Sequence, residues 1–125
     1  MTIVLAGVNS RYIHTNPALY ALRRAAAGST AAGELHLAQY TINQPPTELV
    51  ADIYGKRPDI LAFSVYIWNV DYLRSVLSDL RGLLPQSIML LGGPEVSARP
   101  AYFLRQLPAD AICVGEGEDA FAALL

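Results

Sequence analysis

Residues 87–93 read SIMLLGG, and residues 94–100 continue PEVSARP. The first stretch is a short apolar run that ends in two glycines, Gly92 and Gly93, and a proline follows at once. A continuous apolar run of this length predicts a strand that is buried on both faces of a parallel sheet. The glycine pair indicates either a tight turn into the next helix or a point where another group lies against the backbone.

Four further segments have strand-like character. Three are continuous apolar runs at Thr2–Val8, Asp59–Tyr66 and Asp110–Gly115, and they predict central strands similar to Ser87–Gly93. The fourth, Glu34–Thr41, has polar residues interleaved among its apolar ones, which is typical of an edge strand.

Helical segments separate these strands. Asn16 as N-cap and Pro17 as the first helical residue predict a helix over residues 17–28. Further helices are predicted at Thr47–Lys56 and Pro100–Leu107, and a last one opens at Glu118 with an acidic residue at its positive end.

The clearest helix begins after Asn69, which we predict as its N-cap, with Asp71 in its first turn. Its apolar residues form one stripe at helical spacing, which predicts the face that packs on the sheet. The stripe consists of Val70, Leu73, Leu77, Leu80 and Leu84.

Strands alternate with helices along the whole chain, and the connections are short. This pattern predicts an α/β fold of three layers, a doubly wound, flavodoxin-like or Rossmann-like sheet of five parallel strands. We expect the strand order 2-1-3-4-5, with residues 1–125 forming one domain. Right-handed crossovers place all loops that follow strands on one edge of the sheet.

Composition excludes several classes of protein. The chain has 125 residues and a formal net charge of −2, so it lacks the basic excess that a nucleic-acid partner requires. Its single cysteine, Cys113, can form neither an internal disulfide nor, alone, a zinc or iron–sulfur site. The N-terminus reads as a first strand and no run is long enough to span a bilayer, so we expect a cytoplasmic protein without a membrane partner.

Ligands of doubly wound sheets bind outside the carboxyl ends of the strands. The sequences of these loops do not match those of the common ligand-binding proteins that have this fold. The strand tips at Asn9 and Ser64 carry no phosphoacceptor aspartate, the loop after the first strand is poor in hydroxyls for a flavin phosphate, and Gly7 alone does not make a dinucleotide fingerprint. What remains is a platform that is rich in glycine, uncharged in its middle and aromatic at one corner, where Tyr66 and Trp68 either cover a ligand face or belong to the core.

Taken together, these loops resemble the cobalamin-binding domain that lies N-terminal to the radical S-adenosylmethionine core of many bacterial enzymes. The matching pieces are Ser64-Val65-Tyr66, then GGPEVS at residues 92–97, then VGEGE at residues 114–118. The resemblance spans essentially the whole chain, and the two glycine-containing pieces together are more specific than either alone.

The resemblance implies how the cofactor lies. The nucleotide tail of cobalamin would enter a slot between the sheet and a flanking helix, the corrin ring would lie across the strand tips, and Gly92 and Gly93 would be bare so that the tail lies against them. Ser64 would hydrogen-bond the buried tail, and the turn at residues 115–118 would contact sugar or phosphate through backbone N–H groups. The implied cofactor-binding residues are Asn9, Tyr12, Ser64, Val65, Tyr66, Trp68, Gly92, Gly93, Pro94, Glu95, Gly115, Glu116 and Gly117.

The chain departs from the cobalamin domains of mutases and methionine synthase, which carry D-x-H-x-x-G after the first strand. His14 has neither the aspartate nor the glycine of that motif, so we predict that it is not a lower ligand of cobalt. Two other functions stay open. One is a domain that has kept the fold but lost cobalamin and serves protein or substrate interaction, and the other is a flavin or nucleotide binder.

The chain ends in DAFAALL, inside an apolar helical pattern with no capping residue, and we therefore expect it to be part of a longer protein. The domain is expected to be non-catalytic by itself. By resemblance, a radical S-adenosylmethionine domain with its 4Fe–4S cluster would follow in the same chain, and the parent enzyme would be a methyltransferase or would assist another radical rearrangement.

Overall fold

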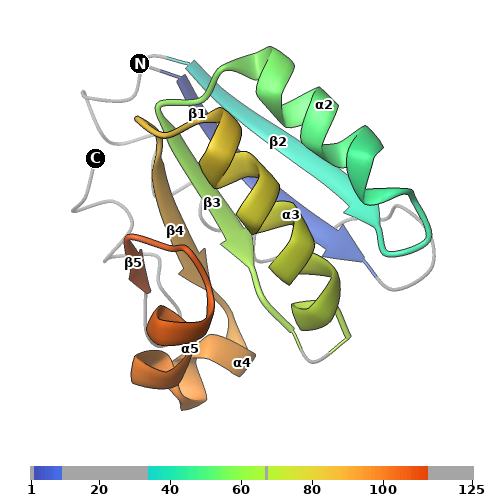
Figure 1. Cartoon of the computed structure of the whole chain (residues 1–125). Coiled ribbons are helices and arrows are strands. Elements are labelled where there is room, and N and C mark those ends of the chain that lie inside the picture. The colour runs from blue at the N-terminus through green and yellow to red at the C-terminus, as the bar shows by residue number, and fades with distance from the viewer. Residues whose placement is uncertain (1, 10–33, 67, 113–125) are drawn as a thin grey trace.

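The computed structural model describes residues 2–9, 34–66 and 68–112, apart from the side chains of Pro94 and Glu95. The strands are β1 (Thr2–Asn9), β2 (Glu34–Thr41), β3 (Ile60–Ser64), β4 (Ile88–Gly92) and β5 (Ala111–Ile112). The helices are α2 (Pro46–Lys56), α3 (Val70–Leu83), α4 (Pro94–Ala98) and α5 (Pro100–Gln106) (Figure 1).

The strands form one parallel sheet with the order β2-β1-β3-β4-β5, which confirms the predicted topology and the edge position of β2. The arrowheads of β1, β2, β3 and β4 all point toward the same edge, and α4 lies at that edge beyond β4 (Figure 1). We call this the carboxyl edge of the sheet.

The predicted elements differ from the observed ones mainly at their ends. The run Asp59–Tyr66 was expected to be a longer strand than β3, but beyond Ser64 the chain turns into the loop that precedes α3. No helix was predicted for residues 94–98, whereas Pro94 at the first turn opens the short helix α4. The predicted helices at residues 17–28 and from Glu118, and residues 113–115 of the last predicted strand, lie outside the described residues.

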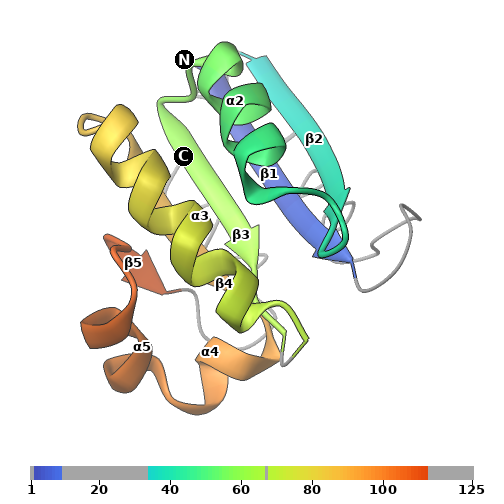
Figure 2. The same cartoon turned by 45° about the vertical axis from the view of Figure 1, so that its right-hand side comes forward.

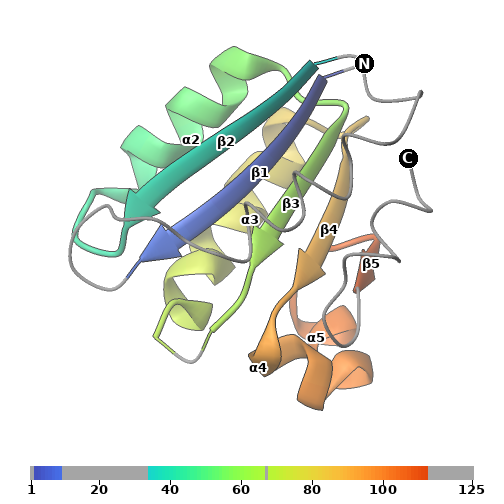
Figure 3. The same cartoon turned by 180° about the vertical axis from the view of Figure 1, so that it is seen from behind.

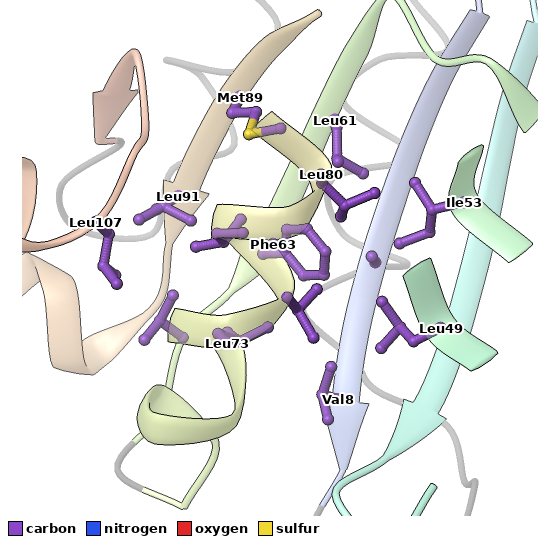
Figure 4. Packing of buried hydrophobic residues seen from close by; sticks show 14 of the residues in the cluster. Val8, Leu49, Ile53, Leu61, Phe63, Leu73, Leu80, Met89, Leu91 and Leu107 are labelled. Carbon is purple, nitrogen blue, oxygen red and sulfur yellow. The ribbon is translucent and has the colours of Figure 1, made fainter. Parts of the chain in front are cut away.

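Helices α2 and α3 cover one face of the sheet, which we call the first face (Figures 1 and 2). The predicted stripe of α3 is confirmed, since Leu73, Leu77 and Leu80 are fully buried. Figure 4 shows Leu73 and Leu80 of α3 and Leu49 and Ile53 of α2 packed over side chains of β1, β3 and β4. Burial of this apolar area is the main favourable contribution to the stability of the fold.

The opposite face, here called the second face, is seen in front of α2 and α3 when the molecule is viewed from behind (Figure 3). Among the described residues, its apolar cluster contains strand residues alone. The cluster consists of Ile3, Leu5, Ile60, Ala62 and Leu90, with Leu35, Leu37 and Ala111 packed against it. Within the described part of the chain, none of the helices is long and apolar enough to cross a bilayer.

Candidate functional site at the carboxyl edge

The second face is built from rows of side chains that run across the strands. Because successive side chains of a strand alternate between faces, residues that are paired in register share a face. The row farthest from the carboxyl edge is Leu35, Ile3, Ile60 and Ile88, and the middle row is Leu37, Leu5, Ala62, Leu90 and Ala111. Both rows are entirely apolar.

The row next to the carboxyl edge is different. In register it reads Gln39, Gly7, Ser64 and Gly92, from β2 through β1 and β3 to β4. The last three residues of this row, Gly7, Ser64 and Gly92, carry a hydrogen or a hydroxymethyl group, whereas the middle row carries Leu5, Ala62 and Leu90 at these strands. We call them the small-residue row. On the second face, side-chain volume therefore falls over β1 and β4 just before these strands end, and it stays small over β3.

Gly93 has a different structural role from Gly92. Its φ of 106° lies in the region that residues with a side chain rarely adopt. Among the described glycines, Gly93 alone has such a positive φ. A Cβ atom on Gly93 would lie 2.6 Å from the carbonyl oxygen and 2.9 Å from the nitrogen of Val65. Gly93 therefore has an internal reason to lack a side chain, since the backbone of Val65 occupies that space, and its contact with a ligand stays a prediction.

The loop from Val65 to Asn69 is held at the carboxyl edge by backbone and side-chain hydrogen bonds. The N–H of Val65, whose side chain is fully buried, donates to the carbonyl of Gly92 at 2.7 Å and so continues the pairing of β3 with β4. Asn69 is fully buried, and its Oδ1 accepts from the N–H of Tyr66 at 2.8 Å. Its Nδ2 donates to the carbonyls of Val8 at 3.0 Å and Ser64 at 3.2 Å.

These bonds correct one sequence prediction. Asn69 does occupy the N-cap position of α3, but its side chain makes no capping hydrogen bond to the helix. Instead the carboxamide joins the ends of β1 and β3 to the following loop. The sequence offered only the cap interpretation, because Asn is common at N-caps and the partner Val8 is distant along the chain.

Two aromatic rings stand on this loop. The rings of Tyr66 and Trp68 stack in parallel, with centroids 4.5 Å apart and planes inclined by 4°. Trp68 is 47% exposed, so the core interpretation does not hold for it. A stacked pair that is anchored by Asn69 and open to solvent presents a flat, apolar surface beside the strand tips.

The described part of the carboxyl edge is neutral and polar. Asn9 and Ser64 are buried at the ends of β1 and β3, and the carbonyl of Asn9 accepts from the N–H of Ile42 at 2.9 Å. Within the described residues, no group of three or more His, Cys, Asp or Glu side chains is placed to hold a metal ion. Such an edge suits the binding of a large neutral molecule through shape and hydrogen bonds.

The perturbed ionisable groups are structural. Burial and a hydrogen bond to Asp52 raise the pKa of Tyr40 far above its usual value, and the same hydrogen bond lowers the pKa of Asp52. The hydrogen bond from the N–H of Met89 and, after it, the Arg81 guanidinium lower the pKa of Asp110. Asp52 lies on α2, and Asp110 precedes β5, so these groups stabilise contacts between elements away from the small-residue row.

The structure thus brings together most predicted site residues that it describes. Asn9, Ser64, Val65, Tyr66, Trp68, Gly92 and Gly93 all lie at the carboxyl edge. Pro94 and Glu95 open α4 there, but their side chains are outside the described set, as are Tyr12, Gly115, Glu116 and Gly117. Gly7 and Gln39 were not predicted as site residues, because the register that sets them in the row of Ser64 follows from strand pairing.

The comparisons with known proteins agree with this arrangement. The family model described as "B12 binding domain" matches residues 3–125. The chain belongs to this family. Its five-stranded parallel sheet is therefore that of a B12-binding domain.

Two curated relatives carry informative names. The chain is 36% identical over 88 residues to the "Cobalamin-dependent radical SAM methyltransferase TokK" of Streptomyces tokunonensis, which covers 66% of this chain and 13% of that protein. It is 39% identical over 69 residues to "2-(S-pantetheinyl)-carbapenam-3-carboxylate methyltransferase" of Streptantibioticus cattleyicolor, covering 54% of this chain and 10% of that protein. The chain thus spans a small part of the length of these relatives.

Solved structures show the same fold. The cobalamin-dependent S-adenosylmethionine radical enzyme OxsB with aqua-cobalamin bound superposes with a TM-score of 0.81 at 19% identity, over 98% of this chain and 18% of that chain. A cobalamin-binding protein from Desulfitobacterium hafniense DCB-2 gives a TM-score of 0.69 at 21% identity, over 98% of this chain and 56% of that chain.

Proposed function

We propose that the chain is the cobalamin-binding module of a cobalamin-dependent radical S-adenosylmethionine enzyme. The observation that carries the proposal is the small-residue row in a chain that belongs to the B12-binding family. Gly7, Ser64 and Gly92 leave the second face without bulky side chains at the edge where ligands of doubly wound sheets bind. A flat nucleotide tail needs such a surface.

The described residues fit a corrinoid in two further respects. Ser64 supplies a hydroxyl beside two glycines that carry no polar side chain, which is a donor suited to a buried heterocyclic base. The exposed Trp68, stacked on Tyr66, offers apolar area beside the strand tips, where the edge of a corrin ring would lie.

We further propose that cobalamin binds here without a histidine as lower ligand. The sequence that follows β1 lacks the D-x-H-x-x-G pattern, and the histidine in that sequence, His14, has neither the aspartate nor the glycine of the pattern. His14→Ala is therefore expected to leave the visible spectrum of bound cobalamin unchanged. A large spectral shift in this variant would identify His14 as a cobalt ligand.

The activity of the parent enzyme is also a proposal. Bound cobalamin would supply a carrier for a methyl group, and the relatives named above are methyltransferases that are much longer than this chain. We infer that the parent is a methyltransferase whose radical domain lies elsewhere in its chain. This chain's part would be to bind and orient the cofactor.

Mixing the purified chain with hydroxocobalamin tests the proposal. Co-elution of cobalamin with the protein, together with a changed visible spectrum, is the expected result. If neither occurs, a domain that has lost cobalamin and serves interaction becomes the better interpretation. A yellow protein with a flavin spectrum as purified would instead indicate the flavin alternative.

A further inference from the structure

Gln39 is a partly exposed residue whose side-chain amide oxygen, Oε1, is buried. It lies on β2 in register with Gly7, so its side chain shares the second face with the small-residue row. Within the described part of the chain, the Oε1 atom of Gln39 is the one buried side-chain oxygen or nitrogen atom that has no hydrogen-bond partner. A buried acceptor that is left unpaired costs free energy, so its retention requires a compensating interaction.

The neighbours of Gln39 sharpen the question. Toward the interior of the sheet, the same face of β2 carries Leu37 and Leu35, which pack against the apolar cluster. An apolar residue at position 39 would continue this pattern. Instead a carboxamide stands next to Gly7, which carries no side chain between Gln39 and Ser64 on the second face.

We propose that Gln39 accepts a hydrogen bond from a ribose hydroxyl of the bound corrinoid, an inference that rests on the proposed function. Gln39 precedes the end of β2 at Thr41 by two residues, which places it about 7 Å below the strand tips. A group in contact with it must lie over the sheet face, where the nucleotide tail would enter, and not over the tips, where the ring would lie.

The chemistry of the tail selects the ribose. The dimethylbenzimidazole base offers ring nitrogens and methyl groups but no N–H donor once it is attached to the sugar, and the phosphodiester oxygens only accept. The ribose hydroxyls are donors of suitable strength for an amide oxygen. Cobinamide lacks the base, ribose and phosphate but keeps the ring amides and the linker amide, so it separates the ribose from every other donor.

Binding of hydroxocobalamin and of cobinamide to the wild-type chain and to Gln39→Met tests the inference. Met has nearly the shape of Gln and no amide acceptor. We expect cobalamin to bind Gln39→Met about fivefold more weakly, with cobinamide affinity changed less than about twofold. The urea midpoint of the free variant should not fall, because an unpaired polar atom has been removed.

Two controls accompany this variant. Leu37→Met lies on the same strand and face and changes no polar atom, so both affinities should stay at the wild-type values. Gln39→Glu keeps an acceptor oxygen at the position and should bind cobalamin more tightly than Gln39→Met. If Gln39→Met folds poorly, the comparison of Gln39→Glu with the wild type tests the inference instead.

Unchanged cobalamin affinity in Gln39→Met would overturn the inference while leaving the proposed function intact. An equal loss of cobalamin and cobinamide affinity would also overturn it, since the partner would then be an amide of the ring or linker. A wild-type chain that binds no cobalamin would overturn the proposed function, and this inference with it.

Discussion

The side chain of Asn69 donates a hydrogen bond of 3.0 Å to the carbonyl oxygen of Val8, a residue that lies 61 positions earlier in the chain. The bond ties the start of α3 to the end of β1, and the same amide group binds the carbonyl of Ser64 at the end of β3. With the bond from the N–H of Tyr66, one buried carboxamide fixes the relative positions of the two strand tips and the aromatic loop.

Replacing Asn69 with Ala should therefore destabilise the chain by about 2–4 kcal/mol, because the change leaves the carbonyls of Val8 and Ser64 and the N–H of Tyr66 without this partner. Urea denaturation measures the loss. Ser78→Ala, at an exposed position of the same helix, is the control and should change stability by less than about 0.5 kcal/mol. Equal midpoints for the two variants would show that the Asn69 network contributes nothing.

Two buried serines allow binding and stability to be separated. Ser64 ends β3 within the small-residue row, whereas the hydroxyl of Ser87, before β4, donates to the carbonyl of Pro58. Ser64→Ala should bind cobalamin about fivefold more weakly, because it loses one hydrogen bond to the ligand that contributes about 1 kcal/mol. The urea midpoint of this variant should equal that of the wild type. Ser87→Ala should lose about 1 kcal/mol of stability and keep its affinity. The reverse pattern would contradict the assignment of Ser64 to the ligand.

The acid stability of the chain depends on Asp110. Its carboxylate accepts from the N–H of Met89 at 2.7 Å and from Arg81 at 2.8 Å, and these bonds lower its pKa in the folded state. A carboxyl whose pKa is lower in the folded than in the unfolded state contributes stability above the unfolded pKa of about 4. That contribution is lost as the pH falls through the folded pKa.

Asp110→Asn should accordingly cost about 1 kcal/mol at neutral pH, a modest value because the carboxylate is half exposed. The difference from wild type should shrink as the pH falls below about 4. Thermal unfolding between about pH 3 and pH 7 would show this convergence. A difference that stays constant with pH, or that matches Asp79→Asn on the exposed surface of α3, would exclude a role for the ionised group.

The sequence was sufficient for the fold because its signals there are local. The apolar runs predicted the strands, and the stripe of Leu73, Leu77 and Leu80 predicted a helix that packs on the sheet. The handedness of the crossovers then limited the possible strand orders. The exact ends of β3 and the helix α4 were missed, since they depend on how the chain turns at Val65 and Pro94.

The site could be predicted only in part because its decisive relations are distant in sequence. Ser64 and Gly92 were identified from their motifs, but the register that sets Gly7 and Gln39 beside them follows from strand pairing. The bond from Asn69 to Val8 likewise joins separate elements. The predicted residues Tyr12, Gly115, Glu116 and Gly117 lie outside the described part of the chain and stay predictions.

The neighbouring glycines at the end of β4 give the most direct test of the proposed slot. Gly92 lies in the small-residue row, and its φ, unlike that of Gly93, is one that residues with side chains adopt. Gly92→Val should therefore fold with a loss of less than about 1.5 kcal/mol while filling space over the second face. Its affinity for cobalamin should fall about tenfold or more.

Gly93→Val is the matched contrast. A Cβ at Gly93 meets the backbone of Val65 at 2.6 Å, and a β-branched residue with positive φ is strained in addition. This variant should lose at least about 3 kcal/mol of stability, so a loss of binding in it would report misfolding and not a filled slot. Urea denaturation and cobalamin titration of both variants separate the two effects. If Gly92→Val binds cobalamin as tightly as the wild type does, the nucleotide tail does not lie over the small-residue row.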